Sequence, residues 1–338
     1  MLFRSDFICE MADTASRLAV DKLHIVGDIY DRGAHPDTIM DYLMKFHDVD
    51  LQWGNHDIIW MGAAAGHWAS ICNVLRMNIS YNNFDMLEDG YGINLRVLSE
   101  FAQKVYGDDP CEYFKPKRFD LNRFDPVDDL LAARMHKAIA ICQFKIEGQR
   151  IEAHPEYELD HRLLLDKIDF KKGTVDIQGK IYEMRDSNLP TVDTENPYQL
   201  TKEEYSMMKA ISLSFKRSKQ LQKHIGFLFS HGSLYSVQNK NLMYHGCIPM
   251  DENGDFIECT LNNHTSKGKA YMDYLDEQIR KAYYRAKDSE ETGYSGDLMW
   301  YLWLGSKSPL FGKDQMTTFE RLFSTRSEER RVGKECRS

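Results

Sequence analysis

A short apolar run, a helix and a second apolar run follow one another near the start of the chain, and each apolar run ends at a glycine. The first run covers residues 23–26 and stops at Gly27, a helix then opens at Pro36, and the second run covers residues 49–53 and stops at Gly54. Proline is best tolerated in the first turn of a helix, so Pro36 suits that position. Strand, helix and strand within about 30 residues form a β-α-β unit, whose two strands are parallel. The sequence therefore predicts an α/β protein.

Most of the remaining chain has helical patterning. Helical spacing of apolar residues is present at 7–19, at 60–82, through much of 85–225 and at 268–287, whereas apolar runs at 225–230 and 241–244 predict further strands. We therefore expect a core with a parallel or mixed sheet, interrupted by a long helical insertion.

This patterning divides the chain into segments. We expect the N-terminal part of the α/β core at 1–84, a helical insert at 85–225, core strands with a His-Gly motif at 226–265, a helical segment at 266–325 and a tail at 326–338. The tail is dense in Arg, Glu and Lys and has almost no apolar residue, so we expect it to be disordered or foreign to the fold.

The composition excludes some classes of function. Lys and Arg number 43 against 52 Asp and Glu, for a net charge of −9, which argues against a nucleic-acid partner. The net negative charge does not exclude a small phosphorylated substrate, because such a molecule is affected only by the charges near its binding site. No apolar run reaches the roughly 18 residues of a membrane span, so no membrane partner is expected. The seven cysteines contain no C-x-x-C pair, which favours reduced thiols and a cytoplasmic location.

Two polar motifs directly follow the two predicted strands. The first is Gly-Asp-Ile-Tyr-Asp-Arg-Gly at 27–33, and the second is Gly-Asn-His-Asp at 54–57. In an open parallel sheet, ligands bind beyond the carboxyl ends of the strands, which is where both motifs fall. The Asp28 carboxylate has two oxygens and could bridge two divalent cations, and Asn55 offers a neutral carbonyl oxygen as a further ligand.

The other side chains of these motifs suit phosphoester hydrolysis. His56 is a candidate general acid, Asp31 could hold its ring in one orientation, and Arg32 could grip phosphate with two donors, together with Asn55. A metal pair would activate water and neutralise phosphate charge. In the simpler interpretation, the aspartates cap the next helix and the second motif makes a turn. We favour the catalytic interpretation, because two such motifs at this spacing seldom arise by chance.

A third candidate element is a His-Gly step after an apolar run. It occurs at His245-Gly246 and again at His231-Gly232. An imidazole at the end of a strand suits a metal ligand, but a histidine satisfied within a turn is equally compatible with either step. Only one of the two needs to be a ligand.

The motifs resemble those of the calcineurin-like metallophosphatase superfamily, and the wider sequence is most similar to its bacterial class III fructose-1,6-bisphosphatase branch. The resemblance extends from about residue 19 to about residue 323, and the blocks that carry it lie at 23–33, 52–65, 91–96, 161–165, 227–235, 241–250 and 303–321. It implies a metallophosphatase-type sheet core and a manganese-activated enzyme of gluconeogenesis. That enzyme would remove the 1-phosphate of fructose 1,6-bisphosphate, a small-molecule sugar bisphosphate.

The resemblance also implies residue roles. Asp28 would be the metal bridge, Asn55 and His245 would bind one of the two metals, and His56 with Asp31 would be the acid and its orienting partner. The surroundings of His245 look more like the superfamily's His-Gly step than those of His231 do.

The chain departs from the superfamily pattern in two places. The superfamily begins with an Asp-x-His, which is absent here, and ends with a Gly-His, which occurs here only at Gly66-His67 in the helical segment 60–82. We therefore expect a central fragment with a core incomplete at both ends and an incomplete Mn²⁺ centre. The alternatives are a phosphoprotein or nucleotide phosphatase on the same scaffold, or a catalytically incomplete, non-catalytic module.

Overall fold

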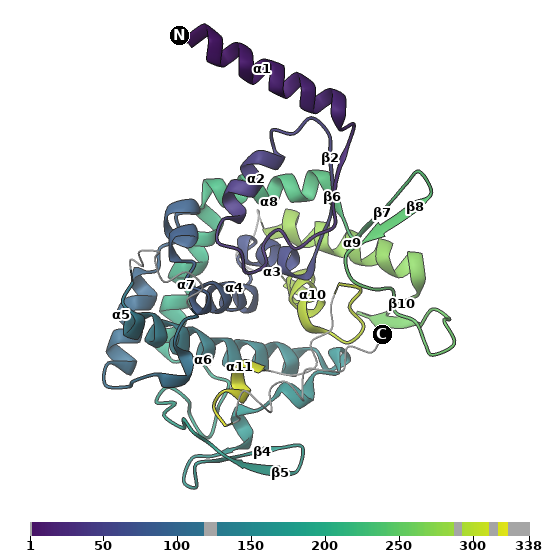
Figure 1. Ribbon diagram of the computed structural model, residues 1–338. Helices are drawn as coiled ribbons and strands as arrows, with labels where there is room; N and C mark the ends of the chain where they lie inside the picture. Colours follow the sequence, from purple (N-terminus) through teal and green to yellow (C-terminus); the bar gives the residue numbers. More distant parts are fainter. Residues whose placement is uncertain (1, 118–126, 287–292, 311–316, 324–338) are drawn as a thin grey trace.

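A computed structural model describes residues 2–117, 127–286, 293–310 and 317–323 of the chain (Figure 1). The helices are α1 (Leu2–Ala19), α2 (Pro36–Leu43), α3 (Asn55–Ala64), α4 (Trp68–Ser80), α5 (Arg96–Tyr106), α6 (Asp129–Ala153), α7 (Lys202–Arg217), α8 (Lys219–His231), α9 (Gly268–Ala286), α10 (Gly293–Leu304) and α11 (Thr317–Glu320). A π-helical turn, η1 (Met86–Gly90), and the 3₁₀ turns η2 (Glu112–Phe114), η3 (Pro155–Tyr157), η4 (Asp160–Arg162) and η5 (Leu165–Lys167) connect them.

The strands are short and form several small sheets. They are β1 (Leu23–Ile25), β2 (Val49–Gln52), β3 (Ile168–Asp169), β4 (Thr174–Ile177), β5 (Lys180–Glu183), β6 (Gly232–Ser233), β7 (Tyr235–Gln238), β8 (Asn241–Tyr244), β9 (Cys259–Leu261) and β10 (His264–Ser266). The sheet that matters for the motifs has the order β1-β2-β6, and both of its strand pairs are parallel. The other sheets, β3-β4-β5, β7-β8 and β9-β10, are antiparallel.

Helices make up most of the body (Figure 1). The helix α3 packs against α4, α8 and α10, and α4 in turn packs against α6. Every residue of α3 is buried, and Trp53, Trp60 and Trp300 are among the largest fully buried side chains. The first turn of α3, which carries the second motif, is thus fixed by packing on several sides. By contrast, α1 stands away from the body, and its Phe7, Ile8 and Leu18 are exposed (Figure 1).

A polar network crosses the core along α6. The ammonium group of Lys137 lies 2.7 Å from Asp109 and 2.7 Å from Asp186, and that of Lys145 lies 2.8 Å from Glu204. Both lysine side chains have zero exposure. Buried charges of this kind are tolerated only when they are paired and hydrogen-bonded, as these are.

The predicted β-α-β unit is confirmed, and β1 and β2 are parallel. The strand predicted at 225–230 is wrong: these residues belong to α8, whose Leu221, Ile225, Leu228 and Phe229 are buried at helical spacing. An uninterrupted apolar run does not by itself distinguish a strand from a buried helix, and here the segment is helical.

Three further expectations have mixed outcomes. The mostly helical stretch 85–225 also contains the antiparallel sheet β3-β4-β5. The pair Gly66-His67 lies in the turn between α3 and α4 rather than within a helix, and the His67 ring accepts the N–H of Ser70 at the start of α4. The expected tail at 326–338 lies outside the described residues. Within the described residues, no helix is both long enough and apolar enough to span a membrane.

Candidate active site

The chain leaves β1 through a left-handed turn that places the first motif. Gly27 has φ +83° and Asp28 has φ +59°. Residues other than glycine seldom adopt this left-handed backbone conformation. A Cβ atom on Gly27 would lie 2.6 Å from the backbone nitrogen of Gly54 and 2.6 Å from Nδ1 of His245. Only glycine fits this contact, which brings three segments of the chain together.

The carboxylate of Asp57 joins the two motifs. It accepts the N–H groups of Asp28 at 2.7 Å, Gly54 at 2.8 Å and Tyr30 at 3.2 Å, and it is almost fully buried. Burial raises the pKa of Asp57 to about 6, although these backbone donors partly oppose the shift. Asp57 therefore fixes the position of one strand-end loop relative to the other.

Asp28 lies between the backbone of His56 and the side chain of His245. Its Oδ1 accepts the backbone N–H of His56 at 3.0 Å, and its Oδ2 lies 3.4 Å from Nε2 of His245. A Cβ atom on Gly54 would come within 2.2 Å of Oδ1, so the approach depends on that glycine. Burial pushes the pKa of Asp28 upward, but the hydrogen bonds from His245 and His56 outweigh burial and lower it.

His245 reaches this position from the segment after β8. Its Nδ1 donates to the carbonyl oxygen of Val26 at 2.7 Å, which turns Nε2 toward Asp28. The pKa of His245 is raised to about 9, chiefly by its hydrogen bond with Asp28. A ring with one nitrogen held by a backbone carbonyl and the other directed at a carboxylate is the usual arrangement of a histidine metal ligand.

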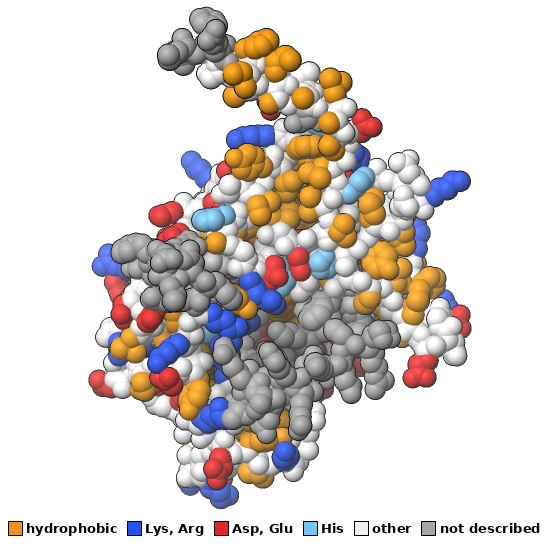
Figure 2. All heavy atoms as spheres, in the orientation of Figure 1, with side chains coloured by type: hydrophobic (Ala, Val, Ile, Leu, Met, Phe, Trp, Pro, Cys, Tyr) orange, Lys and Arg blue, Asp and Glu red, His pale blue; other side chains and the backbone are white. Residues whose placement is uncertain are grey.

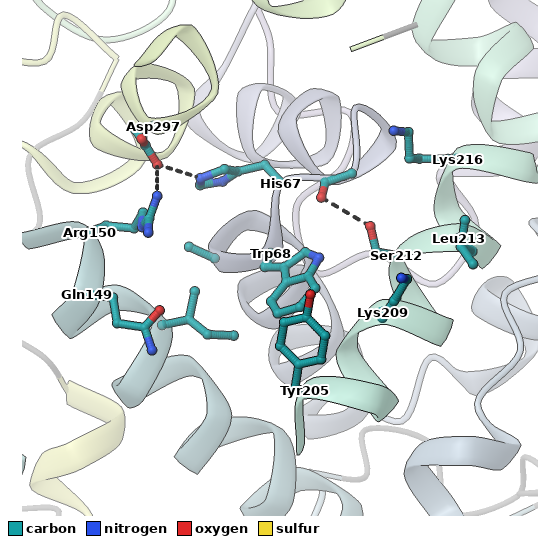
Figure 3. A pocket seen from close by; sticks show the side chains of 13 residues that line it. His67, Trp68, Gln149, Arg150, Tyr205, Lys209, Ser212, Leu213, Lys216 and Asp297 are labelled. Carbon is teal, nitrogen blue, oxygen red and sulfur yellow. Dashed lines mark hydrogen bonds and ion pairs between the residues drawn. The ribbon is translucent and has the colours of Figure 1, made fainter. Parts of the chain in front are cut away.

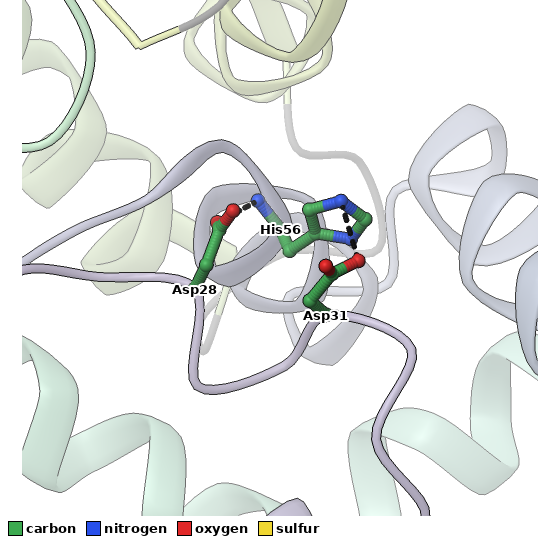
Figure 4. A group of neighbouring side chains, drawn as sticks. All are labelled: Asp28, Asp31 and His56. Atoms are coloured by element: carbon green, nitrogen blue, oxygen red, sulfur yellow. Dashed lines mark hydrogen bonds and ion pairs between the residues drawn. The ribbon is translucent and has the colours of Figure 1, made fainter.

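The His56 imidazole lies on the other side of Asp28. Its Nε2 is 2.9 Å from Oδ1 of Asp31, and Figure 4 shows the Asp31 carboxylate at the ring and the Asp28 carboxylate at the backbone nitrogen of His56. Trp303 of α10 meets the ring edge-on, with 4.8 Å between ring centroids. The His56 side chain is 6% exposed and that of Asp31 is 41% exposed, so the pair connects the interior with solvent.

The remaining candidates border this group. The guanidinium of Arg32 lies 3.4 Å from Asp31 and 5.8 Å from the ring centre of Tyr81, with the side chain 53% exposed. Asn55 is buried at the first residue of α3, next to His56. In Figure 2, acidic side chains and a histidine lie near the centre of the visible face, where Figure 1 places α3, with basic side chains just below.

The donor atoms are suited to a divalent cation. Ligand atoms of Asp28, Asp31 and His56 all lie within 4.8 Å of one another, and His245 adds a nitrogen on the far side of Asp28. His231 is placed elsewhere, at the end of α8 with its ring stacked on Phe227 at 4.2 Å. Of the two His-Gly histidines, the structure thus brings His245 to Asp28.

Two residues that help to build the site, Asp57 and Trp303, were assigned no role from the sequence. Asp57 has a local signal, because an acidic residue at the third position of a helix often accepts the N–H at its start. Trp303 has none, since it meets His56 only through the packing of α10 on α3.

The sequence is similar to a known family and to named bacterial proteins. A family model described as Firmicute fructose-1,6-bisphosphatase matches residues 3–336. The fructose-1,6-bisphosphatase class 3 of Clostridium botulinum (strain Okra / Type B1) is 53% identical over 319 residues, which are 94% of this chain and 48% of that protein. The protein of the same name from Clostridium tetani (strain Massachusetts / E88) is 52% identical over 316 residues, with the same shares of 94% and 48%. The chain therefore spans about half the length of the curated relatives it matches. No solved structure matches it.

Proposed function

The chain belongs to the Firmicute fructose-1,6-bisphosphatase family, and we propose that it forms the active-site part of a phosphomonoester hydrolase that removes the 1-phosphate of fructose 1,6-bisphosphate. The observation that carries this proposal is the position of Asp28, which contacts His245 on one side and the His56 segment on the other. A carboxylate with a histidine on either side offers ligand atoms for a divalent cation, and a bound cation can activate water for phosphate hydrolysis.

In this proposal, Asp28, Asn55 and His245 hold a divalent cation, and Asp28 is shared with a second one. Manganese is the metal we propose. The cations would activate water and neutralise charge on the transferred phosphoryl group. The carbonyl of Val26 would keep the His245 ring oriented for binding, as ligand histidines generally require.

The other residues would move a proton and position the phosphate. His56, whose ring is paired with Asp31, would give the leaving sugar oxygen a proton from its imidazole. Asp31 would keep the imidazole in that orientation. Arg32 is exposed and adjacent to Asp31, where its planar guanidinium could take two phosphate oxygens at once.

We further propose a metallophosphatase-type core around β1, β2 and β6, with residues 85–225 as a helical insert. The active protein would work in the cytoplasm. The six described cysteines are free thiols, which suits a reducing compartment.

The direct test is phosphate release from fructose 1,6-bisphosphate with manganese. It should be run on the 338-residue chain and on the longest natural protein that contains it, because the relatives are about twice as long. We expect fructose 6-phosphate as the sugar product, which shows that the 1-phosphate has left. Hydrolysis of phosphopeptides or nucleotides, with none of fructose 1,6-bisphosphate, would overturn the substrate assignment.

Metal stoichiometry separates an enzyme from an inert module. Two bound manganese ions per chain with turnover would support the two-metal proposal. One ion or none, without turnover in the longer protein, would favour the non-catalytic alternative.

A further inference from the structure

The middle residue of the first motif is anchored in the core. Tyr30 lies between Asp28 and Asp31 in the loop after β1 and is almost fully buried, whereas the two carboxylates are partly exposed. The Tyr30 ring packs on Trp60 of α3, with 5.0 Å between ring centroids, and its backbone N–H donates to Asp57. The position of the Tyr30 side chain therefore helps to fix the backbone that carries the two aspartates.

The Tyr30 hydroxyl belongs to a group of hydrogen-bonded side chains. It lies 3.0 Å from the hydroxyl of Tyr91, the residue that follows η1, and the Tyr91 hydroxyl lies 3.1 Å from Nδ1 of His224 in α8. Nε2 of His224 lies 2.9 Å from the side-chain nitrogen of Gln220 and 3.3 Å from Oδ1 of Asp41 in α2. We call these five side chains the tyrosine-histidine network.

The network is buried at its inner end and reaches solvent at its outer end. Tyr91 and His224 are almost fully buried, whereas Asp41 is partly exposed. Burial lowers the pKa of His224, although Asp41 opposes this shift, so the ring is neutral at pH 7. A neutral imidazole has one donor and one acceptor nitrogen, and a hydroxyl can both donate and accept. Removal of one member would leave its neighbours buried without a partner, which costs more than the hydrogen bond itself contributes.

Tyr91 is itself well anchored. Its backbone N–H donates to the carbonyl of Met86 in η1 at 3.0 Å, and its carbonyl accepts the hydroxyl of Ser218 at the start of α8. Its ring contacts Trp60 at 5.5 Å and Tyr30 at 6.3 Å between centroids. The Tyr91 hydroxyl thus meets Tyr30 from a residue that is fixed by two other elements.

We propose that Tyr91 and His224 are positioning residues, which hold Tyr30 and, through it, the backbone between Asp28 and Asp31 in the geometry that the candidate active site needs. This inference rests on the proposed function for the role that it gives to the loop. The two residues act through Tyr30 and not on the substrate. Their loss should therefore loosen the loop and lower turnover, with little effect on affinity for the sugar phosphate.

Hydrogen exchange in the metal-free 338-residue chain tests the inference without any catalysis. Tyr91→Phe removes only the hydroxyl and keeps the ring against Trp60. The reporters are the amides of Asp28 and Tyr30, which donate to Asp57. We expect these amides to exchange roughly tenfold faster in the variant, because two buried polar groups lose their partner. Unchanged exchange would overturn the proposal.

Two control variants remove a buried hydroxyl elsewhere. Tyr198→Phe removes a hydroxyl that donates to a carboxylate at 2.6 Å, and Ser212→Ala removes one that donates to the carbonyl of Gly66, just beyond the end of α3 (Figure 3). Both should lower the urea-denaturation midpoint, as Tyr91→Phe does, but should leave exchange at 27–33 unchanged. An equal acceleration in either control would mean that a general loosening of the core explains the effect, and would overturn the proposal.

A double-mutant cycle shows whether the two tyrosines act through one contact. Tyr30→Phe should accelerate exchange at 27–33 as Tyr91→Phe does, and the double variant should exceed either single variant by less than about twofold. Effects of the two substitutions that simply multiply would overturn the proposal, because they would show that the hydroxyls act independently.

His224 is tested by a removal and by a conservative replacement. His224→Leu takes away both ring nitrogens and should accelerate exchange at 27–33 as Tyr91→Phe does. His224→Asn places an amide near the position of Nδ1 and should restore much of the slow exchange. Slow exchange in His224→Leu would overturn the proposal. If His224→Leu does not fold, His224→Phe, which keeps a ring, takes its place.

Turnover separates this inference from the proposed function. In the longest natural protein that contains the chain, Tyr91→Phe should lower kcat for fructose 1,6-bisphosphate by roughly tenfold and change KM by less than about twofold. If the unaltered protein releases no phosphate, the proposed function fails, while the exchange measurements still decide whether Tyr91 holds the loop. An active unaltered protein whose kcat is matched by Tyr91→Phe would overturn the positioning role alone.

Discussion

Charged side chains are used in opposite ways in α6 and at the ends of β1 and β2. Along α6, Lys137 and Lys145 are fully buried and each is matched by carboxylates at 2.7 to 2.8 Å. At the strand ends, Asp31 is 41% exposed and Arg32 is 53% exposed, and the contact between Asp28 and His245 is longer, at 3.4 Å. The first set is closed to solvent, whereas the second is open to it.

The difference separates stabilising charges from reactive ones. In α6, each charged group is satisfied by another group of the protein, so its removal would leave an unpaired charge in the core. At the strand ends, the backbone is held by Asp57 and by glycines that permit close approach, and the carboxylates of Asp28 and Asp31 stay partly exposed to solvent. We therefore expect changes in the first set to lower stability, and changes in the second to lower activity.

The largest expected effect is that of Asp28→Asn. It should abolish phosphate release by the longer protein, because one oxygen of the carboxylate that we propose as the metal bridge is replaced by an amide nitrogen, which binds cations poorly. The thermal midpoint should change little, since the Asp28 backbone N–H still donates to Asp57. Asp48→Asn, at an exposed ion pair with Lys22, is the matched control and should retain activity. Normal turnover by Asp28→Asn would remove Asp28 from the proposed mechanism.

His56→Asn should lower kcat by roughly 10²- to 10⁴-fold, as expected for the loss of a general acid. Bound manganese, measured by elemental analysis, should be unchanged. His47→Asn, at an exposed histidine before β2, serves as the control. If His56→Asn instead strips the metal, His56 is a ligand, an arrangement that its proximity to Asp28 and Asp31 would also allow.

Lys137→Met tests the buried ion pairs of α6. Removal of the ammonium group leaves Asp109 and Asp186 without their buried cation, which should cost about 3–5 kcal/mol of unfolding free energy. Urea denaturation measures this loss, and kcat of the folded protein should be unaffected. Lys172→Met removes an exposed pair with Asp169 and should leave the denaturation midpoint almost unchanged. Similar urea-denaturation midpoints for the two variants would contradict the distinction between buried, stabilising charges and solvent-exposed ones.

Asp297→Asn should have a smaller, pH-dependent effect, of roughly 1–3 kcal/mol at pH 7. The folded-state pKa of Asp297 is depressed, so its contribution to stability is complete above its unfolded pKa of about 3.9 and is lost as the pH falls below that value. Urea denaturation of the native and variant proteins at pH 7, 5 and 3.5 should therefore show the difference shrinking only at the lowest pH. A difference that is constant over this range would mean that the charge of Asp297 is not what stabilises the fold.

The local part of the fold could be predicted from the sequence. The strands β1, β2 and β8, the helix that opens at Pro36 and the turns at Gly27 and Gly54 follow from short-range patterns, and the parallel pairing of β1 with β2 follows from their order. The helix α8 could not be recognised from its run of apolar residues, because burial on one face of a helix and burial in a strand give similar runs over a few residues.

The site could be predicted only where its residues are neighbours in the sequence. Asp28, Asp31 and His56 are joined by the β-α-β unit, so their proximity follows from the order of the elements. The contact between His245 and Val26 spans 219 positions and depends on how the segment after β8 returns to the sheet. From the residues alone both His231 and His245 stayed candidates, and the resemblance favoured His245; of the two, the structure brings His245 to Asp28.

The edge-on contact of Trp303 with His56 has an optical consequence. Indole emission is sensitive to charge on a neighbouring imidazole, and these rings are 4.8 Å apart. Any ligand that displaces Asp31 from His56 alters the electric field at Trp303, while Trp53, Trp60 and Trp300 remain enclosed in the core. The protein thus carries a built-in fluorophore at the point where we propose that the leaving group is protonated, and occupancy of the site should be readable without a dye or a coupled assay.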